Sequence, residues 1–561
     1  MKTGAQVLCE SLINEGVEVI FGISGGTVIP MYDAFSEYPQ IRRVLVRHEQ
    51  AAAHAAAGYA RVKHRAGVCV GTSGPGATNL VTGIADAYMD STPMVVITGQ
   101  VACSFIGKDA FQECDITGIT LPITKHNYLV RNPDDIARTI KEAFHVAQTG
   151  RPGPVLVDIP KDIQTALTDV SYAETMDLPG YRPKYDADPA RVASVAELLN
   201  RAERPVVVAG RGVNVSQAYE ELRDLVETMQ APVVHTLLGL GSFPPQHYLD
   251  LGMLGMHGTV YANKAVQNAD LILALGTRFG DRTTMRTNDF AQKAVVVHVD
   301  IDPAEIGKNV APFASVVGDV KSVLKHLNPL LKSVDRSEWL SKVTQWRTDY
   351  PLTFHKPTKK LSAREVIRKV CQNANEETIV VTGVGQHQMF AAQEYCSPRR
   401  DGFVSSGGHG TMGFELPAAL GAQVACPNEA IWVVAGDGGF QMTMQELSTI
   451  VQEGLPVKIA VISNGYLGMV RQWQEMFCNR NYVDVNIHNP DFVKLADAYG
   501  IPAMRVDREE DVSGAIERAK AHPGAFLIEF TVEPEENVFP MCAAGTSLND
   551  LIEAPQTAVA R

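Results

Sequence analysis

The sequence has few of the features that would assign it to several common protein classes. Its nine cysteines are scattered and never form a CxxC pair, which argues against a zinc ribbon and against a disulfide framework. The net charge is -13 and no run of five like charges occurs, so neither nucleic acid nor an anionic membrane is an expected partner. No apolar run approaches the ~18 residues of a membrane span, and residues 1–22 lack the continuous apolar core of a signal peptide. We expect a cytoplasmic protein that binds small molecules.

The chain does have length and a regular alternation of short apolar runs with longer amphipathic segments. Its 561 residues, 45% of them hydrophobic, suffice for three or four domains of about 150 residues each. The alternation is typical of βαβ units around a parallel sheet, and polar, proline-rich stretches at 177–191 and 349–361 divide it into blocks. We predict three doubly wound α/β domains, at residues 1–177, 190–345 and 360–545.

The first and third blocks share one order of elements. In the first, an alanine-rich helix at 49–61 precedes a strand at 68–70 and a glycine turn at 71–76. In the third, a helical segment at 413–425 precedes a strand at 431–435 and a glycine turn at 436–439. A duplicated unit would place the two ends of one extended ligand between matching sheets, although any two α/β units have this much in common.

The most informative motif is Gly436-Asp437-Gly438, which is followed after 24 residues by Ser463-Asn464. A glycine turn at a strand end lets backbone N–H groups approach a phosphate, and Asp437 and Asn464 offer the hard oxygen ligands that suit Mg²⁺. The motif resembles that of thiamine-diphosphate enzymes, which is GDG followed by about two dozen residues and NN. Ser463 replaces the first Asn here, whereas the metal-ligand position is retained.

A second constellation surrounds Glu49, which opens the alanine-rich helix. The two histidines nearby, His48 and His54, are six residues apart, which excludes the HExxH helix of a zinc protease. Taken alone, Glu49 would be a helix cap or a solvated residue. The thiamine-enzyme resemblance implies instead that Glu49 is the catalytic carboxyl that contacts N1′ of the aminopyrimidine ring.

Further segments are similar to the catalytic subunits of the acetolactate synthase family. The segment Ala110-Phe111-Gln112-Glu113 implies that Phe111 and Gln112 face the substrate, and Lys125 would lie near the substrate channel. Met412 would be the apolar wedge that bends the cofactor, and Trp473 would shape the acceptor pocket. A core Phe, a surface Lys or a packing Trp would be the ordinary reading of these residues.

The resemblance also implies a set of ligands for thiamine diphosphate and Mg²⁺. The cofactor set is Gly385, Gln386, His387, Gly410, Met412, Gly436, Gly438, Gly439, Asn464, Tyr466, Leu467, Gly468 and Met469. The metal set is Asp437, Asn464 and Tyr466.

The middle block has no phosphate P-loop, but its glycine turns carry arginine and aspartate side chains. Turns of this kind can clamp a pyrophosphate and an adenine-ribose, although a single one is weak evidence. Their order resembles the flavin domain of the same family and implies FAD. The implied contacts are Arg151, Gly210, Arg211, Gly212, His257, Gly276, Arg278, Arg282, Asp300, Ile301 and Asp319.

Some positions depart from the family pattern. Gly280 replaces the first Asp of an FDDR segment, which bears on flavin affinity. His409 and Glu415 stand where Leu and Gly are common, on either side of Met412, and they bear on the preferred acceptor.

The resemblance implies decarboxylation of pyruvate on thiamine diphosphate and ligation of the hydroxyethyl carbanion to pyruvate or 2-oxobutyrate. This would be the first common step of branched-chain amino-acid biosynthesis. It also implies a homodimer or tetramer with the active site at the dimer interface, and a regulatory small subunit as a further partner. The alternatives are an FAD-dependent, pyruvate oxidase-like oxidoreductase, another thiamine-dependent 2-oxoacid decarboxylase, and a flavin-binding scaffold without activity.

Overall fold

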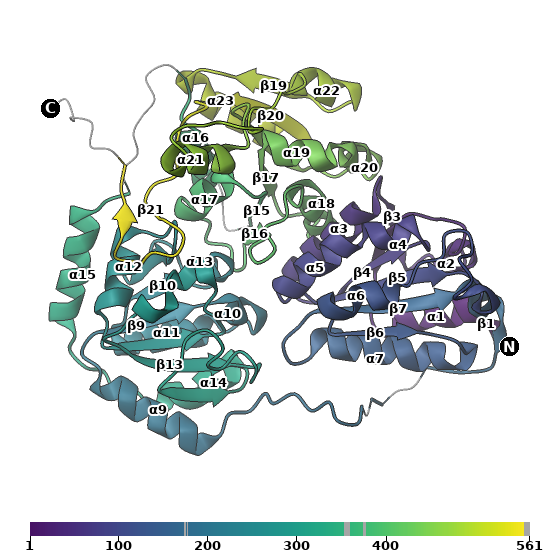
Figure 1. Cartoon of the computed structure of the whole chain (residues 1–561), viewed down its shortest axis with the longest axis horizontal. Helices are drawn as coiled ribbons and strands as arrows, with labels where there is room; N and C mark the ends of the chain where they lie inside the picture. Colours follow the sequence, from purple (N-terminus) through teal and green to yellow (C-terminus); the bar gives the residue numbers. More distant parts are fainter. Residues whose placement is uncertain (173–174, 177, 353–359, 374–376, 555–561) are drawn as a thin grey trace.

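Three six-stranded parallel sheets, each covered by helices, organise the chain (Figure 1). The computed structural model describes residues 1–172, 175–176, 178–352, 360–373 and 377–554. Each sheet belongs to one domain: the N-domain (from residue 1 to 168), the middle domain (189 to 349) and the C-domain (360 to 540). The predicted fold class is confirmed.

The N-domain sheet has the order β3-β2-β4-β5-β7-β6. Its strands are β2 (Val19–Gly22), β3 (Arg42–Leu45), β4 (Gly67–Gly71), β5 (Met94–Gln100), β6 (His126–Leu129) and β7 (Pro154–Pro160). Its helices are α1 (Gly4–Asn14), α2 (Ile29–Phe35), α3 (Glu49–Lys63), α4 (Pro75–Asn79), α5 (Val81–Met89), α6 (Ile116–Thr120), α7 (Ile136–Gln148) and α8 (Lys161–Thr165). The short strands β1 (Lys2–Thr3) and β8 (Leu167–Thr168) pair antiparallel beside them.

The C-domain sheet has the order β16-β15-β17-β18-β20-β19, which repeats the N-domain order strand for strand. Its strands are β15 (Ile379–Thr382), β16 (Phe403–Ser405), β17 (Ile431–Gly436), β18 (Lys458–Ser463), β19 (Ala503–Val506) and β20 (Phe526–Thr531). Its helices are α16 (Ala363–Gln372), α17 (Gln386–Gln393), α18 (Glu415–Ala425), α19 (Asp437–Thr443), α20 (Leu447–Gln452), α21 (Gly468–Phe477), α22 (Phe492–Ala498) and α23 (Glu509–Ala521). The similarity of the first and third blocks therefore extends to the whole sheet.

The middle domain sheet has the order β11-β10-β9-β12-β13-β14. Its strands are β9 (Pro205–Ala209), β10 (Val233–His235), β11 (Asp250–Met253), β12 (Leu271–Leu275), β13 (Val295–Asp300) and β14 (Ala314–Val317). Its helices are α9 (Pro189–Arg201), α10 (Arg211–Val215), α11 (Tyr219–Met229), α12 (Val260–Asn268), α13 (Asp281–Thr284), α14 (Val320–Leu327) and α15 (Ser337–Asp349). The strand order reverses direction between β9 and β12, so the turns after these strands flank a topological switch point, where α/β sheets bind ligands.

Helix α3 of the N-domain packs directly on α18 of the C-domain (Figure 1). A Cβ at Gly58 would lie 2.0 Å from the carbonyl oxygen of Ala418, and one at Gly421 would lie 1.9 Å from that of Ala55. Only glycine fits at either contact, because any side chain would have to push the facing backbone away. The alanine-rich sequences of both helices thus have a packing cause, since small residues let two helix axes approach closely.

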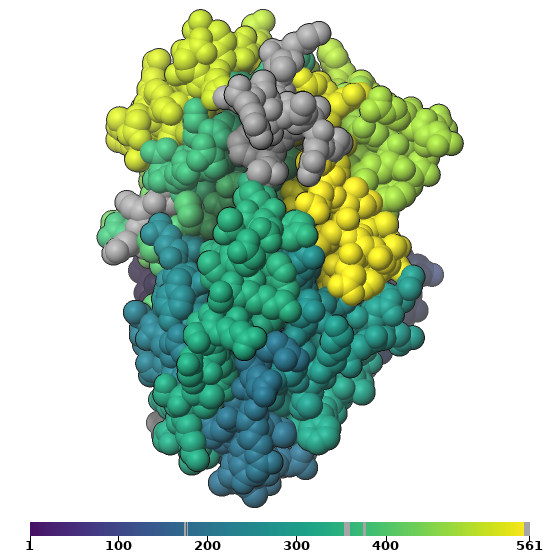
Figure 2. Space-filling model, turned by 90° about the vertical axis from the view of Figure 1, so that its left-hand side faces the viewer, coloured from purple at the N-terminus to yellow at the C-terminus, as the bar shows by residue number. Residues whose placement is uncertain are grey.

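The C-terminal segment returns to the middle domain (Figure 2). Strands β21 (Met541–Cys542) and β22 (Leu551–Ile552) form an antiparallel pair, and the N–H of Cys542 donates to the carbonyl of Met256 at 2.8 Å. Cys542 and Leu548 are buried in an apolar cluster with middle-domain side chains. Within the described part of the chain, no helix combines the length and apolar character that a bilayer crossing requires.

Candidate active site

A cavity opens in the C-domain where three helices begin. It is lined by residues at the starts of α17, α19 and α21, which follow the carboxyl ends of β15, β17 and β18. The first turn of a helix has unpaired N–H groups and a partial positive charge, so three such ends around one cavity favour an anion. The cavity collects the following members of the predicted thiamine diphosphate set: Gly385, Gln386, His387, Met412, Gly436, Gly438, Gly439, Asn464, Tyr466, Leu467, Gly468 and Met469.

Asp437 is the most heavily bonded acid in this cavity. Its Oδ2 accepts from the N–H groups of Asn464 (3.0 Å) and Gly465 (2.7 Å) and from the side-chain amide of Asn489 (2.7 Å), and its Oδ1 accepts from the N–H of Gly438 (2.9 Å). Burial nevertheless raises the pKa of Asp437, because these neutral donors only partly replace water. A cation beside the carboxylate would supply the missing charge.

The oxygen donors around Asp437 suit magnesium. The amide oxygen of Asn464 accepts from the N–H of Tyr466 at 2.9 Å, which fixes the side chain at the end of β18. In the described ranges, no three His, Cys, Asp or Glu side chains gather as a metal cluster. One carboxylate and one amide oxygen are hard donors of the kind that Mg²⁺ prefers when phosphates complete its shell. Tyr466 lines the same cavity, and its role as a third ligand stays a prediction.

The glycines of this cavity leave room for polar side chains. A Cβ at Gly436 would lie 2.7 Å from the ring of His387, and one at Gly468 would lie 2.2 Å from Oε1 of Gln386. Nε2 of His387 is buried and has no hydrogen-bond partner, and burial lowers the pKa of His387 to about 3. A neutral imidazole with a free ring nitrogen fits a phosphate or hydroxyl partner, so the residues present fit the diphosphate.

Met412 lies over the glycine turn. Its Cε is 3.5 Å from the position of a Cβ at Gly438, and the glycines on either side, Gly410 and Gly413, have φ of +69° and +86°. These left-handed conformations let the chain reverse sharply around Met412. Gly410 itself is not among the residues that line the cavity.

The N-domain candidates lie apart from this cavity, whose lining belongs entirely to the C-domain. Glu49 is the first residue of α3, and its Oε2 accepts from the side-chain amide of Asn79 at 2.9 Å. Phe111 is 87% exposed. Gln112 has φ of +60° and packs against Gly74. One chain alone does not bring Glu49 and Asp437 to a common site.

The carboxylate of Glu113 anchors the exposed loop before Gln112. It accepts from the N–H groups of Lys108 (3.2 Å), Ala110 (2.9 Å) and Gly107. These backbone bonds lower the pKa of Glu113, since they stabilise the ionised form. The AFQE motif therefore contains its own loop anchor, which the sequence did not identify.

Lys125 and Trp473 also lie outside the cavity lining. The ammonium of Lys125 donates to the carbonyl of Thr149 (2.8 Å), to the hydroxyl of Tyr181 (3.1 Å) and to the carbonyl of Val146, and burial lowers the pKa of Lys125 to about 8. Trp473 packs on Phe477 and against the apolar cluster of the middle domain. Hydrogen bonds account for Lys125 and apolar packing accounts for Trp473 in the single chain. The substrate contacts of both side chains stay predictions.

Three of the predicted flavin contacts, all of them glycines, lie at the switch point of the middle domain. Gly210 and Gly212 follow β9, and Gly276 follows β12 with φ of +56°. A Cβ at Gly276 would lie 2.4 Å from Cα of Gly212, so the two turns touch. His257 is buried with an unpartnered Nδ1, and burial lowers its pKa to about 4. The glycine cradle fits a dinucleotide at this edge, and the unpartnered nitrogen of His257 is a further polar group that a ligand could satisfy.

Other members of the flavin set already have protein partners. Arg151 pairs with Glu305 (2.6 Å) and Asp302 (3.3 Å) across the boundary of the N-domain and middle domain, and Arg211 pairs with Asp401 (2.8 Å). Three more have local roles: Asp319 caps α14 by accepting from the N–H of Ser322 (3.0 Å), Arg282 pairs with Asp281 (3.1 Å), and Asp300 accepts from the N–H of Asp302 (2.9 Å). Arg278 reaches toward Gly408 of the C-domain, and Ile301 follows Asp300 at the end of β13.

Glu415 occupies in the C-domain the place that Glu49 has in the N-domain. Helix α18 lies between β16 and β17 as α3 lies between β3 and β4, and each helix begins with a glutamate. Glu415 is fully buried, neither carboxylate oxygen makes a hydrogen bond, and burial raises the pKa of Glu415 to about 7. Its Oε1 lies 2.7 Å from the position of a Cβ at Gly439, beneath the glycine turn.

Comparisons with known proteins agree with this geometry. Three models of thiamine pyrophosphate enzymes match: the N-terminal TPP binding domain at residues 2–119, the central domain at 192–327 and the C-terminal TPP binding domain at 383–530. The chain belongs to the thiamine pyrophosphate enzyme family. Thiamine diphosphate is thereby confirmed as its cofactor, and Mg²⁺ and FAD are typical of the family.

Within that family, the chain belongs with the acetolactate synthase large subunits. It is 51% identical over 567 residues to the large subunit of Mycobacterium tuberculosis, covering 98% of this chain and 91% of the relative. The large subunit of Corynebacterium glutamicum is 47% identical over 563 residues (98% and 90%), and that of Cyanidium caldarium is 45% identical over 570 residues (98% and 97%).

The first prediction concerns the metal. Replacing Asp437 by Asn keeps the size of the side chain but removes its charge, so the Mg²⁺ concentration for half-maximal thiamine diphosphate binding should rise at least about tenfold. A magnesium titration at fixed cofactor measures this. Asp491→Asn is the control, because Asp491 caps α22 outside the cavity. An unchanged magnesium requirement in Asp437→Asn would remove this residue from the metal set.

The second prediction concerns Glu415 and pH. Because its pKa is raised, the carboxyl of Glu415 keeps its proton in the folded protein up to about pH 7, whereas the unfolded chain releases it near pH 4.5. The free energy of unfolding therefore falls as the pH rises from about 4.5 to 7. Glu415→Gln removes this loss and should stabilise the protein at pH 8 by up to about 3 kcal/mol, or roughly 2–6 °C in melting temperature. At pH 5 the two proteins should melt together.

Scanning calorimetry at both pH values checks the Glu415 prediction. Glu197→Gln, on the exposed face of α9, serves as the surface control and should show no pH-dependent difference. Equal melting temperatures of Glu415→Gln and the parent at pH 8 would show that ionisation of the buried carboxyl does not destabilise the folded protein.

Proposed function

We propose that the chain makes 2-acetolactate from two pyruvate molecules, and 2-aceto-2-hydroxybutyrate when 2-oxobutyrate is the acceptor. The observation that carries this is the meeting of Asp437, Asn464, His387 and Met412 in one cavity at three helix starts, in a chain that matches acetolactate synthase large subunits over 98% of its length. The reaction would be the first common step of branched-chain amino-acid biosynthesis.

Thiamine diphosphate supplies an electron sink that lets the bond between C1 and C2 of pyruvate break with release of CO₂. The chain's own residues bind and orient. We assign Asp437 and Asn464 to the magnesium-diphosphate end, together with the helix starts at Gln386 and Gly468. Met412 would press on the middle of the cofactor, and its apolar side chain would keep water away from the reacting centre.

We assign to Glu49 the proton at N1′ of the aminopyrimidine. A carboxyl there acts as a general acid and base toward a ring nitrogen, and its bond from Asn79 fixes the rotamer. The cavity of the same chain contains no N-domain residue. We therefore infer that Glu49 and Gln112 of one copy face the cavity of a second copy, so that a dimer is the smallest active unit.

Exposed apolar side chains support this dimer. Phe111 beside Gln112 is 87% exposed, and Val470, which lines the cavity, is 49% exposed. Further large apolar side chains are exposed on both domains, at Phe105, Leu121, Met442 and Phe477. Surfaces of this kind are usually covered in the working assembly.

Two finer assignments belong to the same proposal. The relatives' names describe large subunits, and we infer a regulatory small subunit as a partner. All nine cysteines are free, which supports a cytoplasmic location.

Product analysis tests the reaction. The full chain is incubated with pyruvate, thiamine diphosphate and Mg²⁺, with FAD present or removed. Acetolactate with CO₂ in a ratio of about one to one is expected, since one carboxyl leaves for every two pyruvates joined. Acetate with pyruvate-dependent bleaching of the flavin would identify an oxidase instead, and free acetaldehyde would identify a simple decarboxylase.

The third prediction tests the shared site. Glu49→Gln should lower kcat by about 10² or more while thiamine diphosphate binding stays within about threefold, because the neutral amide cannot exchange the proton. Mixing Glu49→Gln with Asp437→Asn after subunit exchange should restore about a quarter of the parent activity. Half of the dimers are then mixed, and each has one site with both native residues. No recovery on mixing would place the two residues in the same chain's site.

A further inference from the structure

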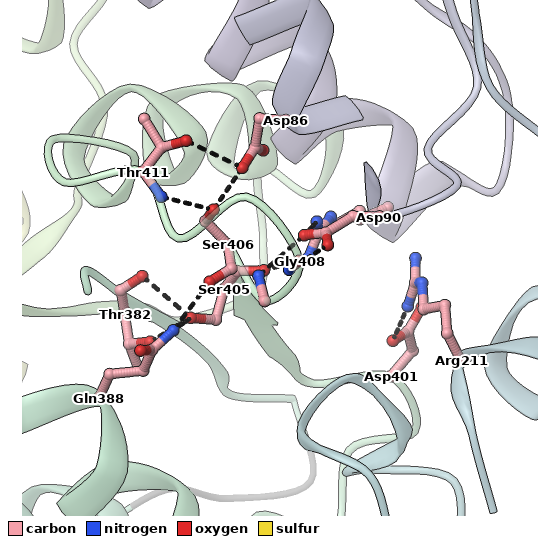
Figure 3. A network of polar contacts seen from close by, with 12 residues as sticks. Asp86, Asp90, Arg211, Thr382, Gln388, Asp401, Ser405, Ser406, Gly408 and Thr411 are labelled. Atoms are coloured by element: carbon pink, nitrogen blue, oxygen red, sulfur yellow. Dashed lines mark hydrogen bonds and ion pairs between the residues drawn. The ribbon is translucent and has the colours of Figure 1, made fainter. Parts of the chain in front are cut away.

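The loop that leads to Met412 is bonded to the N-domain of the same chain. This loop, residues 405–411, runs from the end of β16 to the turn before α18. Figure 3 shows its polar contacts with two carboxylates: Asp86 on α5, and Asp90, which caps the C-terminal end of that helix. Both carboxylates are buried.

Asp90 holds the beginning of the loop. Its Oδ1 accepts from the N–H of Gly408 (2.6 Å), and its Oδ2 accepts from the N–H of Gly407 (2.9 Å) and from the guanidinium of Arg61 (2.5 Å). Arg61, on α3, also donates to the carbonyl of Ser405 at 2.5 Å. A buried charge pair with hydrogen bonds to all of these groups fixes geometry strongly, because each partner would be costly to leave unpaired.

Asp86 and Ser406 connect the two ends of the loop by hydrogen bonds. The hydroxyl of Ser406 donates to Oδ1 of Asp86 and accepts from the N–H of Thr411 at 2.9 Å, while the hydroxyl of Thr411 donates to Asp86 at 3.2 Å. Ser406 thus joins the first part of the loop to the residue directly before Met412. The loop that leads to Met412 is therefore bonded to a side chain of a different domain.

We propose that Asp86, acting through Ser406 and Thr411, is a positioning residue that fixes Met412 against thiamine diphosphate and so accelerates removal of the C2 proton of the cofactor. Asp90 supports it by holding the N–H groups of Gly407 and Gly408. The inference rests on the proposed function, from which Met412 takes its role. The geometry gives the physical reason: an apolar wedge orients a cofactor only if the wedge cannot recede, and a displacement of about 1 Å can cost about 10²-fold in rate. The four backbone and side-chain bonds from Asp86 and Asp90 to the loop prevent that displacement.

Ser405 supplies a matched control for Ser406. Both serines are buried and adjacent, and the hydroxyl of each makes at least two hydrogen bonds. Ser405 accepts from Thr382 (2.7 Å) and Gln388 (2.7 Å), which both belong to the C-domain, and its hydroxyl touches neither Asp86 nor Thr411. A general loss of stability would affect the two Ser→Ala variants alike, whereas a positioning role affects only Ser406.

The experiment measures exchange of the C2 proton of bound thiamine diphosphate for deuterium, by acid quench and NMR, with Mg²⁺ and without substrate. In the full-length holoenzyme, Ser406→Ala should slow the exchange at least about tenfold. The half-saturating concentration of thiamine diphosphate should stay within about threefold, because the diphosphate end is untouched. Ser405→Ala should leave both quantities within about threefold of the parent.

A second variant covers the case in which Ser406→Ala does not fold. Thr411→Val keeps the shape of the side chain and removes only the hydroxyl bond to Asp86, so it should slow the exchange by at least about threefold. Normal exchange in both Ser406→Ala and Thr411→Val, or equal slowing in Ser405→Ala and Ser406→Ala, overturns the inference alone. Absence of accelerated exchange in the parent protein overturns the proposed function, and this inference with it.

Discussion

The packing of α3 on α18 is the contact on which the rest of the structure depends. Two glycines, Gly58 and Gly421, let these helices approach until each touches the other's backbone, and alanines fill the remaining surface. The two helices occupy equivalent places in two sheets of identical strand order. The N-terminal ends of the two helices carry Glu49 and Glu415, and Met412 lies just before α18. One helix pair thereby fixes the parts of both domains to which we assign contacts with the cofactor.

Local sequence patterns could predict the parts of the site that local structure forms. The GDG turn, the spaced Asn464 and the resemblance that they carry indicated a shared site, and Asp437 and Asn464 do follow strands that pair side by side. The convergence of helix starts at Gln386, Asp437 and Gly468 follows from the same βα order. The fold class was equally predictable, since buried strands and amphipathic helices alternate throughout the chain.

Contacts between distant segments could not be predicted in this way. Asn489 donates to Asp437 from 52 residues away, and Asp90 binds a loop more than 300 residues away. Neither has a motif, because the partner of a buried polar group is set by tertiary packing rather than by neighbours in sequence. For Lys125 the family resemblance implied a place near the substrate, which stays a prediction; in the single chain two backbone carbonyls and the hydroxyl of Tyr181 accept from its ammonium. Glu415, noticed only as an unusual residue, takes its meaning from the position that it shares with Glu49.

Contacts between the three domains of one chain hold them rigidly together but leave the active site incomplete. Inside one chain, Asp90 and Arg61 tie the N-domain to the loop before Met412, and Arg211 ties the middle domain to Asp401 of the C-domain. These buried or half-buried pairs make each chain a fixed frame. The frame nevertheless keeps its own Glu49 out of its own cavity, so the polar contacts within a chain cannot complete the site. In the proposed dimer, this rigidity within each chain is what would allow catalysis between chains, because a second copy can place its glutamate accurately only against a cavity that does not move.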